Sequence, residues 1–414
     1  MASEDRQDQA NGRSLGVGHT DTRKFNQHIV VNLIRRLGPV SRRTIMEFSG
    51  ISRATVFSIA DELRASGLVI EDRSDVPSGG RRPSLLSINP EAGFALGIEL
   101  NAGDALVVLV DMIGSVRRKR VLRHSNMGAD DVLSFVGEEA KKLLGASPEA
   151  DGRVLGVGVS APGVLDVESG RVLLASNLEW LDTPVAARLE GILGLPVTVS
   201  NHAVSGALAE LWLGAQRNSG SYLYVYVGSG IGAGLVSYGA SGSVRTRSMP
   251  WFGHMSLEAE GPVCRCGNRG CLELVASTGA VARAYAERVG SDDVPTWDLV
   301  VERVGQRDPH AIAAVKKMGV HLAVGIANLL TFSEPNSIIL GGHLSRAGDL
   351  LTEVVRAELA TRLARRNLPL ELERSELGEE AGAVGIAVSI LERALVAHAI
   401  PVRSELGERT REMR

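Results

Sequence analysis

The sequence predicts an α/β fold of two lobes, preceded by a small domain of three helices and a hairpin. Three helical patterns and two short apolar runs occupy residues 25–88. After Pro90, apolar strand patterns alternate with amphipathic helical patterns, which is typical of sheets covered by helices. Glycines stand at the ends of several of these strands. With 414 residues, the chain is long enough for two or three domains.

The N-terminal segment predicts a tail followed by a first helix. Residues 1–22 are polar and rich in Gly, Asp and Gln, as is typical of a disordered tail. From Phe25 onward, apolar residues recur at helical spacing until Gly38-Pro39 ends the pattern. These residues are Ile29, Val30, Leu33, Ile34 and Leu37.

Two further helices and a hairpin complete this domain. Ser41 begins a helix that ends at Ser49-Gly50, and Ser52 begins one that ends near Gly67. Two short helices joined by a tight turn containing Gly are typical of a helix-turn-helix. The runs 68–72 and 84–88 predict a hairpin whose tip is 78–83. Residues 23–90 are therefore predicted to form a winged helix-turn-helix domain.

Polar residues of this domain are of the kinds that contact DNA. Guanidinium groups bind phosphates, and short hydroxyl side chains reach base edges. The candidates are Arg42, Arg43, Ser52, Arg53, Thr55 and Ser58, with Arg81 and Arg82 at the wing tip. The alternative is a helical protein-interaction module, but motif, wing and local basicity together favour double-stranded DNA. Because the net charge is −3, no global basic field exists and the DNA-binding surface must be local.

The rest of the chain alternates between strands and helices. A Gly-rich turn is predicted at 228–234. Strands are predicted at 95–100, 105–110, 154–160, 196–200, 222–227, 235–237 and 337–340. Helices are predicted at 129–144, 183–193, 277–289, 309–331, 346–364 and 381–398. This order indicates two lobes around a cleft.

The three cysteines of the chain lie within eight residues, at Cys264, Cys266 and Cys271, and His254 lies ten positions before the first. Three thiolates and one imidazole are the donor set of a closed tetrahedral zinc site. An odd number of cysteines excludes a disulfide framework, so the alternative is a loop of reduced cysteines without metal. We predict a structural Zn²⁺, because four protein ligands leave no open position for a reacting water.

These residues resemble the ROK family of bacterial repressors and sugar kinases from about Phe94 to Leu395. The most specific match is Gly253-His-Met255 with Cys264-Arg-Cys-Gly-Asn-Arg-Gly-Cys-Leu-Glu273. The resemblance implies an actin-like, two-lobed ATPase fold, and the winged domain fits the repressor branch. It implies a small lobe at 93–200 to which helix 381–398 returns, a large lobe with the zinc site at 201–380, and a tail at 399–414.

The sequence departs from the family's kinases at three places. The phosphate loop is replaced by Glu99-Leu-Asn-Ala-Gly103, which predicts an ordinary strand end and turn. His202 stands where the kinases have the catalytic Asp, and Trp251 stands where a Glu contacts sugar hydroxyls. We therefore predict no catalytic residues and no kinase activity. The residues that the resemblance implies for ligand binding are Asn201, His202, Trp251, His254 and Glu273.

The leading hypothesis is a cytoplasmic transcriptional regulator, a repressor, that acts as a homodimer or homotetramer on a roughly palindromic operator. Its kinase-like domain is expected to sense a sugar or related effector without phosphorylating it. One alternative is an ATP-dependent sugar kinase with an attached DNA-binding domain. Another is a regulator that answers to a protein partner, for which an exposed Trp251 would be suited. No apolar run approaches eighteen residues and the N-terminus is polar, so no membrane contact is expected.

Overall fold

The computed structural model describes residues 19–73, 84–124, 127–214, 220–238, 244–364 and 370–397. The chain forms two compact units, which divide between Ile88 and Asn89. The first unit contains the three helices and the hairpin. The second contains the strands and helices that follow.

Three helices and three short strands make up the first unit. They are α1 (His19–Leu37), β1 (Val40–Ser41), α2 (Arg42–Ser49), α3 (Arg53–Ala65), β2 (Val69–Arg73) and β3 (Ser84–Ile88). β3 pairs antiparallel with both β1 and β2. Because α1 begins at His19, the prediction of a tail up to residue 22 is four residues too long. The wing tip with Arg81 and Arg82 lies outside the described residues.

Hydroxyl caps begin α2 and α3 at the residues that the sequence predicts. The Ser41 hydroxyl accepts from the backbone N–H of Thr44 at 3.1 Å, and Ser52 does the same from Thr55 at 3.3 Å. Gly50 ends α2 with φ of 68°, a left-handed conformation that glycine adopts without strain. The apolar sides of the three helices and of β3 are buried, including Ile34, Ile45, Ile59, Leu63 and Leu86.

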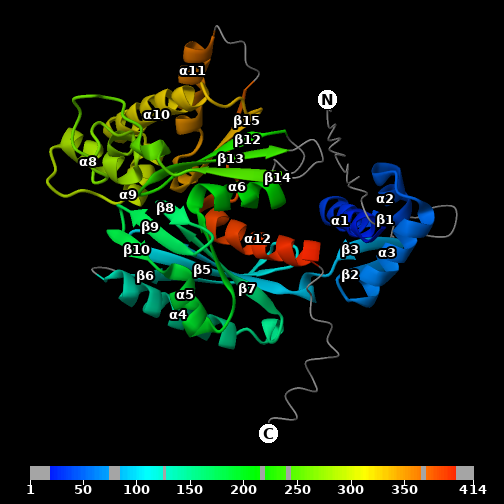
Figure 1. Cartoon of the computed structure of the whole chain (residues 1–414). Helices are drawn as coiled ribbons and strands as arrows, with labels where there is room; N and C mark the ends of the chain where they lie inside the picture. Colours follow the sequence, from blue (N-terminus) through cyan, green and yellow to red (C-terminus); the bar gives the residue numbers. More distant parts are fainter. Residues whose placement is uncertain are drawn as a thin grey trace, which may run out of the picture. The chain divides into compact units, whose positions relative to one another are not determined.

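The first sheet of the second unit has the order β11-β7-β4-β5-β6. Its strands are β4 (Phe94–Leu100), β5 (Asp104–Asp111), β6 (Val116–Arg123), β7 (Val154–Ala161) and β11 (Val197–Asn201). β4, β5 and β6 are antiparallel neighbours, whereas β7 and β11 run parallel to β4. The outer face is covered by α4 (Ala129–Gly145) and α5 (Val185–Leu193) (Figure 1). The sequence did not predict β6, because this edge strand is a run of exposed Arg and Lys rather than an apolar one.

The second sheet has the order β14-β13-β12-β15-β16. Its strands are β12 (Tyr222–Val227), β13 (Ile231–Tyr238), β14 (Val244–Met249), β15 (Ser337–Gly342) and β16 (Glu371–Arg374). Since β13 begins at Ile231, the prediction of a turn that extends to residue 234 was wrong. Gly234 lies within β13. A Cβ at this position would be 2.8 Å from the Ala203 carbonyl oxygen, so the glycine permits close packing and does not form a turn.

Two helices, α6 (His202–Trp212) and α12 (Ala381–Ala397), lie between the sheets (Figure 1). Gly97 and Gly158 are paired neighbours on β4 and β7. A Cβ at Gly97 would lie 2.0 Å from the Ala383 carbonyl oxygen, so the glycines allow α12 to approach the first sheet closely. The C-terminal helix thus packs on the first sheet, although it follows the second sheet in the chain.

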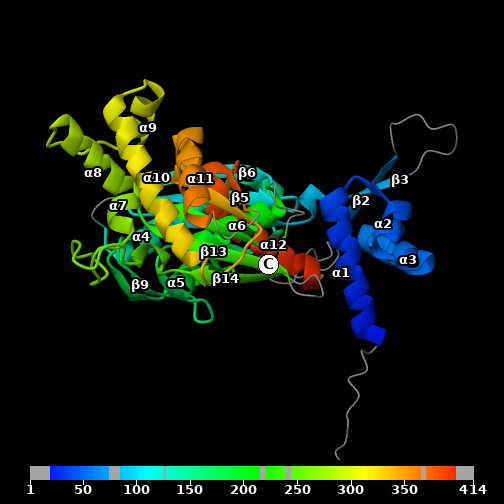
Figure 2. The ribbon, with the colours of Figure 1, turned by 90° about the horizontal axis from the view of Figure 1, so that it is seen from above.

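The two faces of β12 carry different side chains. Tyr222, Tyr224 and Tyr226 alternate with aliphatic residues, so the tyrosines share the face toward α6. The aliphatic face packs against helices on the far side of the second sheet (Figure 2). These helices are α7 (Glu273–Ala276), α8 (Thr278–Val289), α9 (Trp297–Gly305), α10 (Pro309–Leu329) and α11 (Asp349–Leu363).

α10 is the one helix, among the described residues, that is long and apolar enough to cross a membrane by length and composition. Its buried residues, such as Val315, Met318 and Leu322, belong to the same apolar core as the aliphatic face of β12. Packing into that core accounts for its apolar character.

Short elements complete the second unit. β8 (Val164–Asp166), β9 (Arg171–Ala175) and β10 (Trp180–Thr183) form a small antiparallel sheet. The sequence did not predict these strands, which are too short to show a clear period. Single 3₁₀ turns are η1 (Pro90–Ala92), η2 (Pro148–Ala150), η4 (Phe252–His254), η5 (His343–Ala347) and η6 (Gly378–Glu380).

Candidate DNA-binding surface, ligand cavity and metal cluster

The second helix of the helix-turn-helix presents a polar surface. Ser52, Arg53 and Ser58 are exposed and Thr55 is half-buried. The guanidinium carbon of Arg53 lies 5.2 Å from the centre of the Phe57 ring, which supports the side chain at the start of α3. Among these four residues, the hydroxyls of Ser52 and Thr55 bond each other and Ser58 donates to Glu62, whereas Arg53 is exposed at the start of the helix.

Arg42 and Arg43 differ in their surroundings. The Arg43 side chain is 84% exposed and pairs only with Glu47, one helical turn along α2. The Arg42 side chain is 11% exposed, and its guanidinium binds both Glu71 on β2 and Asp61 on α3. The hydrogen bond from Arg42 holds the pKa of Glu71 at about 2, so the pair is charged. Arg42 thus joins the wing to the helices and is not free to bind phosphate.

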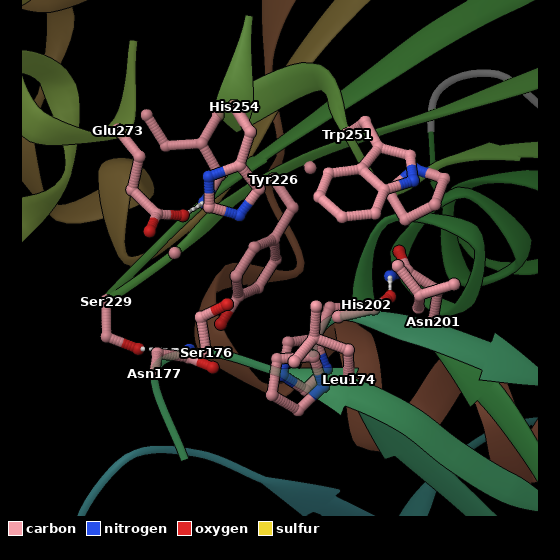
Figure 3. A pocket seen from close by; sticks show the side chains of 17 residues that line it. Leu174, Ser176, Asn177, Asn201, His202, Tyr226, Ser229, Trp251, His254 and Glu273 are labelled. Carbon is pink, nitrogen blue, oxygen red and sulfur yellow. Dashed lines mark hydrogen bonds between the residues drawn. The ribbon is translucent and has the colours of Figure 1, made fainter. Parts of the chain in front are cut away.

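One cavity brings together the five residues predicted to contact a ligand. Its lining includes Asn201, His202, Trp251, His254 and Glu273, and Figure 3 shows their side chains around the same space. They come from the junction of β11 with α6, the turn η4 and the start of α7. Their role in binding stays a prediction.

His202 lies at the base of this cavity and is buried. Its Nδ1 lies 2.8 Å from the Ser160 hydroxyl, and its ring also bonds the carbonyl of Leu100. The ring centre lies 4.9 Å from that of Tyr226. Burial lowers the pKa of His202 to about 3, so the imidazole is neutral. His202 is therefore held within the protein by Ser160 and by the backbone of Leu100.

Asn201 and Glu273 use part of their capacity on the backbone. The Asn201 Oδ1 accepts from the Ala203 N–H at 2.9 Å, and its Nδ2 donates to the Gly163 carbonyl at 3.1 Å. Asn201 thus caps α6 and retains one N–H for another acceptor. The Glu273 Oε2 accepts from the Ile231 N–H at 3.1 Å, which fixes the carboxylate beside the cavity. Desolvation raises the pKa of Glu273.

The residues of the lining that were not among the predicted contacts include four with polar side chains: Ser176, Asn177, Tyr226 and Ser229. Asn177 Nδ2 lies 3.4 Å from the Ser229 hydroxyl across the cavity mouth. Asn177 was visible in the sequence only as part of a family match, because the loop between β9 and β10 has no periodic pattern. For Tyr226, the pattern that could have indicated its position is the alternation of tyrosines with aliphatic residues along β12.

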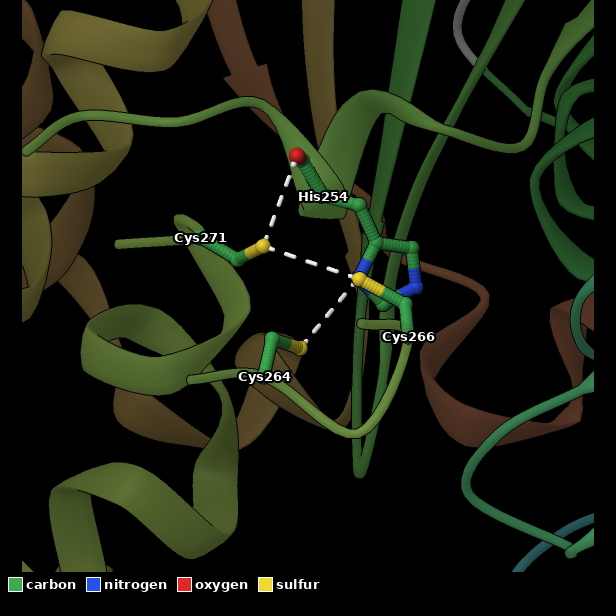
Figure 4. Close-up of side chains that lie close together, drawn as sticks. All are labelled: His254, Cys264, Cys266 and Cys271. Atoms are coloured by element: carbon green, nitrogen blue, oxygen red, sulfur yellow. Dashed lines mark hydrogen bonds between the residues drawn. The ribbon is translucent and has the colours of Figure 1, made fainter. Parts of the chain in front are cut away.

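The three cysteines and His254 form one cluster (Figure 4). Their ligand atoms all lie within 4.8 Å of one another. The Cys266 and Cys271 sulfurs are 3.8 Å apart, and the Cys264 sulfur lies 3.6 Å from Nδ1 of His254. Sulfurs bound to one tetrahedral zinc are about 3.8 Å apart for Zn–S bonds of about 2.3 Å. The donor set and its spacing fit a divalent metal such as zinc.

Backbone hydrogen bonds and glycines form the loop of this cluster. Cys264 N–H donates to the Asn268 carbonyl at 2.7 Å, and Gly267 N–H donates to the Cys264 carbonyl at 2.9 Å. Gly267 and Gly270 have φ of 90° and 60°. A Cβ at Gly270 would lie 1.9 Å from the Glu258 carbonyl oxygen, so glycine is required there.

His254 connects this cluster with the cavity. Because its Nδ1 faces the sulfurs, Nε2 is the nitrogen on the cavity side. The Trp251 ring is 52% exposed, and its centre lies 5.7 Å from that of the His254 ring in an edge-on arrangement. A metal in the cluster would therefore fix one wall of the cavity.

The predicted strand end and turn at residues 99–103 are present. Asn101 N–H donates to the Asp104 carbonyl at 2.9 Å, which closes the turn between β4 and β5. Glu99 at the end of β4 is buried, with its carboxylate near the Tyr226 hydroxyl at 3.3 Å and the Ala383 N–H. Burial raises the pKa of Glu99 to about 7. A buried carboxyl with a raised pKa thus stands at the end of β4.

Comparisons with known proteins agree with this architecture. The xylose repressor of Caldicellulosiruptor bescii is 30% identical over 397 residues, which cover 90% of this chain and 97% of that protein. The DNA-binding transcriptional dual regulator NagC of Escherichia coli K12 is 27% identical over 407 residues, which cover 93% of this chain and 97% of that protein.

Two solved structures show the same fold. A ROK family transcriptional regulator, a homologue of the E. coli MLC protein, has a TM-score of 0.74 at 24% identity and covers 92% of this chain and 99% of its own. The ROK glucokinase of Streptomyces griseus, in complex with glucose and AMPPNP, has a TM-score of 0.65 at 26% identity. It covers 72% of this chain and 99% of its own. The model of the ROK family matches residues 95–393, so this chain belongs to the ROK family.

Proposed function

We propose that this protein is a DNA-binding transcriptional repressor whose ROK unit senses a sugar or sugar derivative without phosphorylating it. The observation that carries the proposal is the combination, in one chain, of an exposed helix-turn-helix surface with a ROK unit whose catalytic position is a buried, neutral His202. The likeness to the C. bescii xylose repressor over 90% of this chain supports it. The site of action is then the cytoplasm.

DNA binding would use α3 and α2. Ser52, Arg53, Thr55 and Ser58 would contact base edges or phosphates, and Arg43 would contact phosphate. Arg42 would position the wing through Glu71 and Asp61. Two copies of the chain, as a homodimer or within a homotetramer, would match a roughly palindromic operator.

Ligand sensing would use the first cavity. Glu273 supplies an acceptor, Nε2 of His254 supplies a second polar group, and the indole of Trp251 offers a face for the C–H surface of a ring. A ligand that binds one arrangement of the protein better than another would shift operator affinity. The alternative of a protein partner at Trp251 would be favoured if no carbohydrate raises the melting temperature of the protein.

A zinc ion would have a structural role. Cys264, Cys266, Cys271 and Nδ1 of His254 would hold it, with no position left for water. Bound there, the metal would supply only a rigid link between η4 and the loop before α7. The metal would affect ligand binding through His254 and Glu273, which lie on either side of the three cysteines in the sequence.

Fluorescence anisotropy with DNA from the upstream region of the gene tests the repressor function. The full chain is expected to bind selectively, with an affinity that falls as salt rises. Arg53→Ala should weaken specific binding by about tenfold or more, consistent with about 1–3 kcal/mol for a base contact. Arg362→Ala on α11 is the matched control and should leave binding unchanged. Loss of salt-sensitive, sequence-selective binding in the wild type would reject the proposal.

The kinase alternative is supported by the likeness to the S. griseus glucokinase over 72% of this chain. A coupled assay of ADP release over a panel of hexoses and pentoses tests it. We expect no sugar-dependent turnover above background. Turnover that disappears in a His202→Ala variant would establish kinase activity and overturn the prediction that the protein does not phosphorylate sugars.

A further inference from the structure

A second cavity adjoins the first. It encloses about 390 Å³, whereas the first encloses about 40 Å³. Gly163, Val164, Asn201 and Pro250 line both cavities, so these residues form a common wall. Sites for small organic ligands usually occupy roughly 300–1,000 Å³. The first cavity alone is below this range, so a ligand that contacts its polar groups must also extend into the second cavity.

The walls of the second cavity carry hydroxyl groups. β11 contributes Thr198 and Ser200, and β14 contributes Thr246 and Ser248. Each strand is an edge of its sheet, so the cavity lies between the free edges of the two sheets. The opposite surface is aliphatic and comes from α6 and α12, for example Leu208 and Ile386.

Hydroxyl and aliphatic groups make up most of the lining of the second cavity. Among the described residues that line the second cavity there is no Asp or Glu, and Arg393 is the one charged side chain. The Arg393 guanidinium is already 3.3 Å from the Thr198 hydroxyl. Hydroxyls on one side and aliphatic groups on the other match a ring that has both hydroxyl and C–H surface.

The side chains near the common wall indicate the direction in which a bound ligand would extend. In Figure 3, Trp251 and Asn201 lie on the opposite side of the first cavity from Glu273. Pro250, which lines both cavities, directly precedes Trp251. A ring recognised by Glu273 and His254 would thus continue past the half-exposed indole toward the second cavity.

We infer that the effector is a carbohydrate of at least two units, a disaccharide or a glycoside. One end occupies the first cavity and the next unit occupies the second. This inference rests on the sugar-sensing function proposed above and specifies its ligand class.

Titration calorimetry on the full chain tests the inference. The probes are xylose, glucose and N-acetylglucosamine, each compared with its disaccharides xylobiose, cellobiose, maltose and N,N′-diacetylchitobiose. At least one disaccharide is expected to bind tenfold or more tightly than its monosaccharide. If no disaccharide binds more tightly than its monosaccharide, the inference is overturned.

Variants locate the second unit of the ligand. Thr246→Trp fills the second cavity from β14 and should remove the preference for the disaccharide. Val167→Trp, at a half-exposed position on another wall, should do the same. Arg245→Trp is the matched control, because neighbouring residues of a strand face opposite sides. A preference that survives both filling variants would overturn the inference.

The outcome can be separated from that of the repressor proposal. Operator binding without any preference for a disaccharide would reject this inference and leave the repressor intact. A preference for a disaccharide without operator binding would reject the repressor and retain the ligand class.

Discussion

The hydroxyl of Ser160 lies 2.8 Å from Nδ1 of His202, and the imidazole also bonds the Leu100 carbonyl. A neutral ring satisfies both partners if Ser160 donates to Nδ1 and Nε2–H donates to Leu100. His202 therefore ties α6 to the ends of β7 and β4. His202 thus stabilises the fold around the cavity.

His202→Gln should change how stability depends on pH. Burial lowers the pKa of His202 to about 3, whereas the unfolded chain takes up a proton near pH 6.5. The wild type therefore loses stability as pH falls from about 6.5 toward 3, at a limit of about 1.4 kcal/mol per pH unit. Urea unfolding from pH 7 to pH 4.5 measures this, and the variant should show a shallower loss. Parallel curves for the two proteins would contradict the buried neutral histidine.

Glu99→Gln should have the opposite dependence. Burial raises the pKa of Glu99 to about 7, so the native state binds this proton more strongly than the unfolded state. The wild type then loses stability relative to the variant as pH rises from about 4.5 through 7. We expect the variant to be more stable at pH 8 by on the order of 2 kcal/mol. Glu168→Gln at an exposed turn is the control. An equal gain in stability at pH 8 in this control would contradict the assignment of the effect to burial of Glu99.

Cys266→Ser should release the metal. The purified wild type is expected to contain one zinc per chain by elemental analysis, and the variant much less. Because the cluster supports one wall of the cavity, the variant should also have a lower melting temperature and weaker operator binding and ligand response. Val263→Ala, 59% exposed beside the first cysteine, is the control. Full operator affinity and ligand response in the metal-free variant would show that the cluster stabilises only its own loop.

Two helical glycines should respond oppositely to alanine. A Cβ at Gly385 of α12 would lie 1.7 Å from the Ser205 carbonyl oxygen of α6, so Gly385→Ala should cost about 1–3 kcal/mol. Gly191 of α5 has no atom within 4 Å of its would-be Cβ, so Gly191→Ala should stabilise by about 0.5–1 kcal/mol. Chemical denaturation of both variants measures the difference. Similar effects at the two positions would disprove the tight contact of α6 with α12.

The neighbouring arginines of α2 should separate stability from DNA binding. Arg42→Ala leaves the low-pKa Glu71 without its guanidinium partner and should lower stability by about 1 kcal/mol or more. Arg43→Ala should leave stability unchanged, because its side chain is 84% exposed, and should weaken operator binding with a smaller salt dependence. Melting curves and anisotropy on both variants check this. Equal loss of DNA binding with no loss of stability in both would show that Arg42 also contacts phosphate.

Local signals in the sequence predicted most elements of the fold. Ser41 and Ser52 cap the helices that they were expected to begin, and the helix at 129–144 is α4. The exceptions include the helices α6 and α9, the edge strands β6, β14 and β16, and the small sheet of β8, β9 and β10. β6 is an edge strand of charged residues, and the small sheet of β8, β9 and β10 has strands too short for a period.

The sequence by itself determined the family, because the resemblance depends on residue types at fixed spacing, and it predicted the metal ligands and the loss of the phosphate loop. Only the tertiary structure decided that Arg42 pairs with Glu71 and that a second cavity adjoins the first, whereas the family resemblance already implied that the C-terminal helix returns to the first lobe. The physical reason is distance along the chain. Ion pairs, close packing at glycines such as Gly97 and Gly385, and shared cavity walls join residues that are near only after folding.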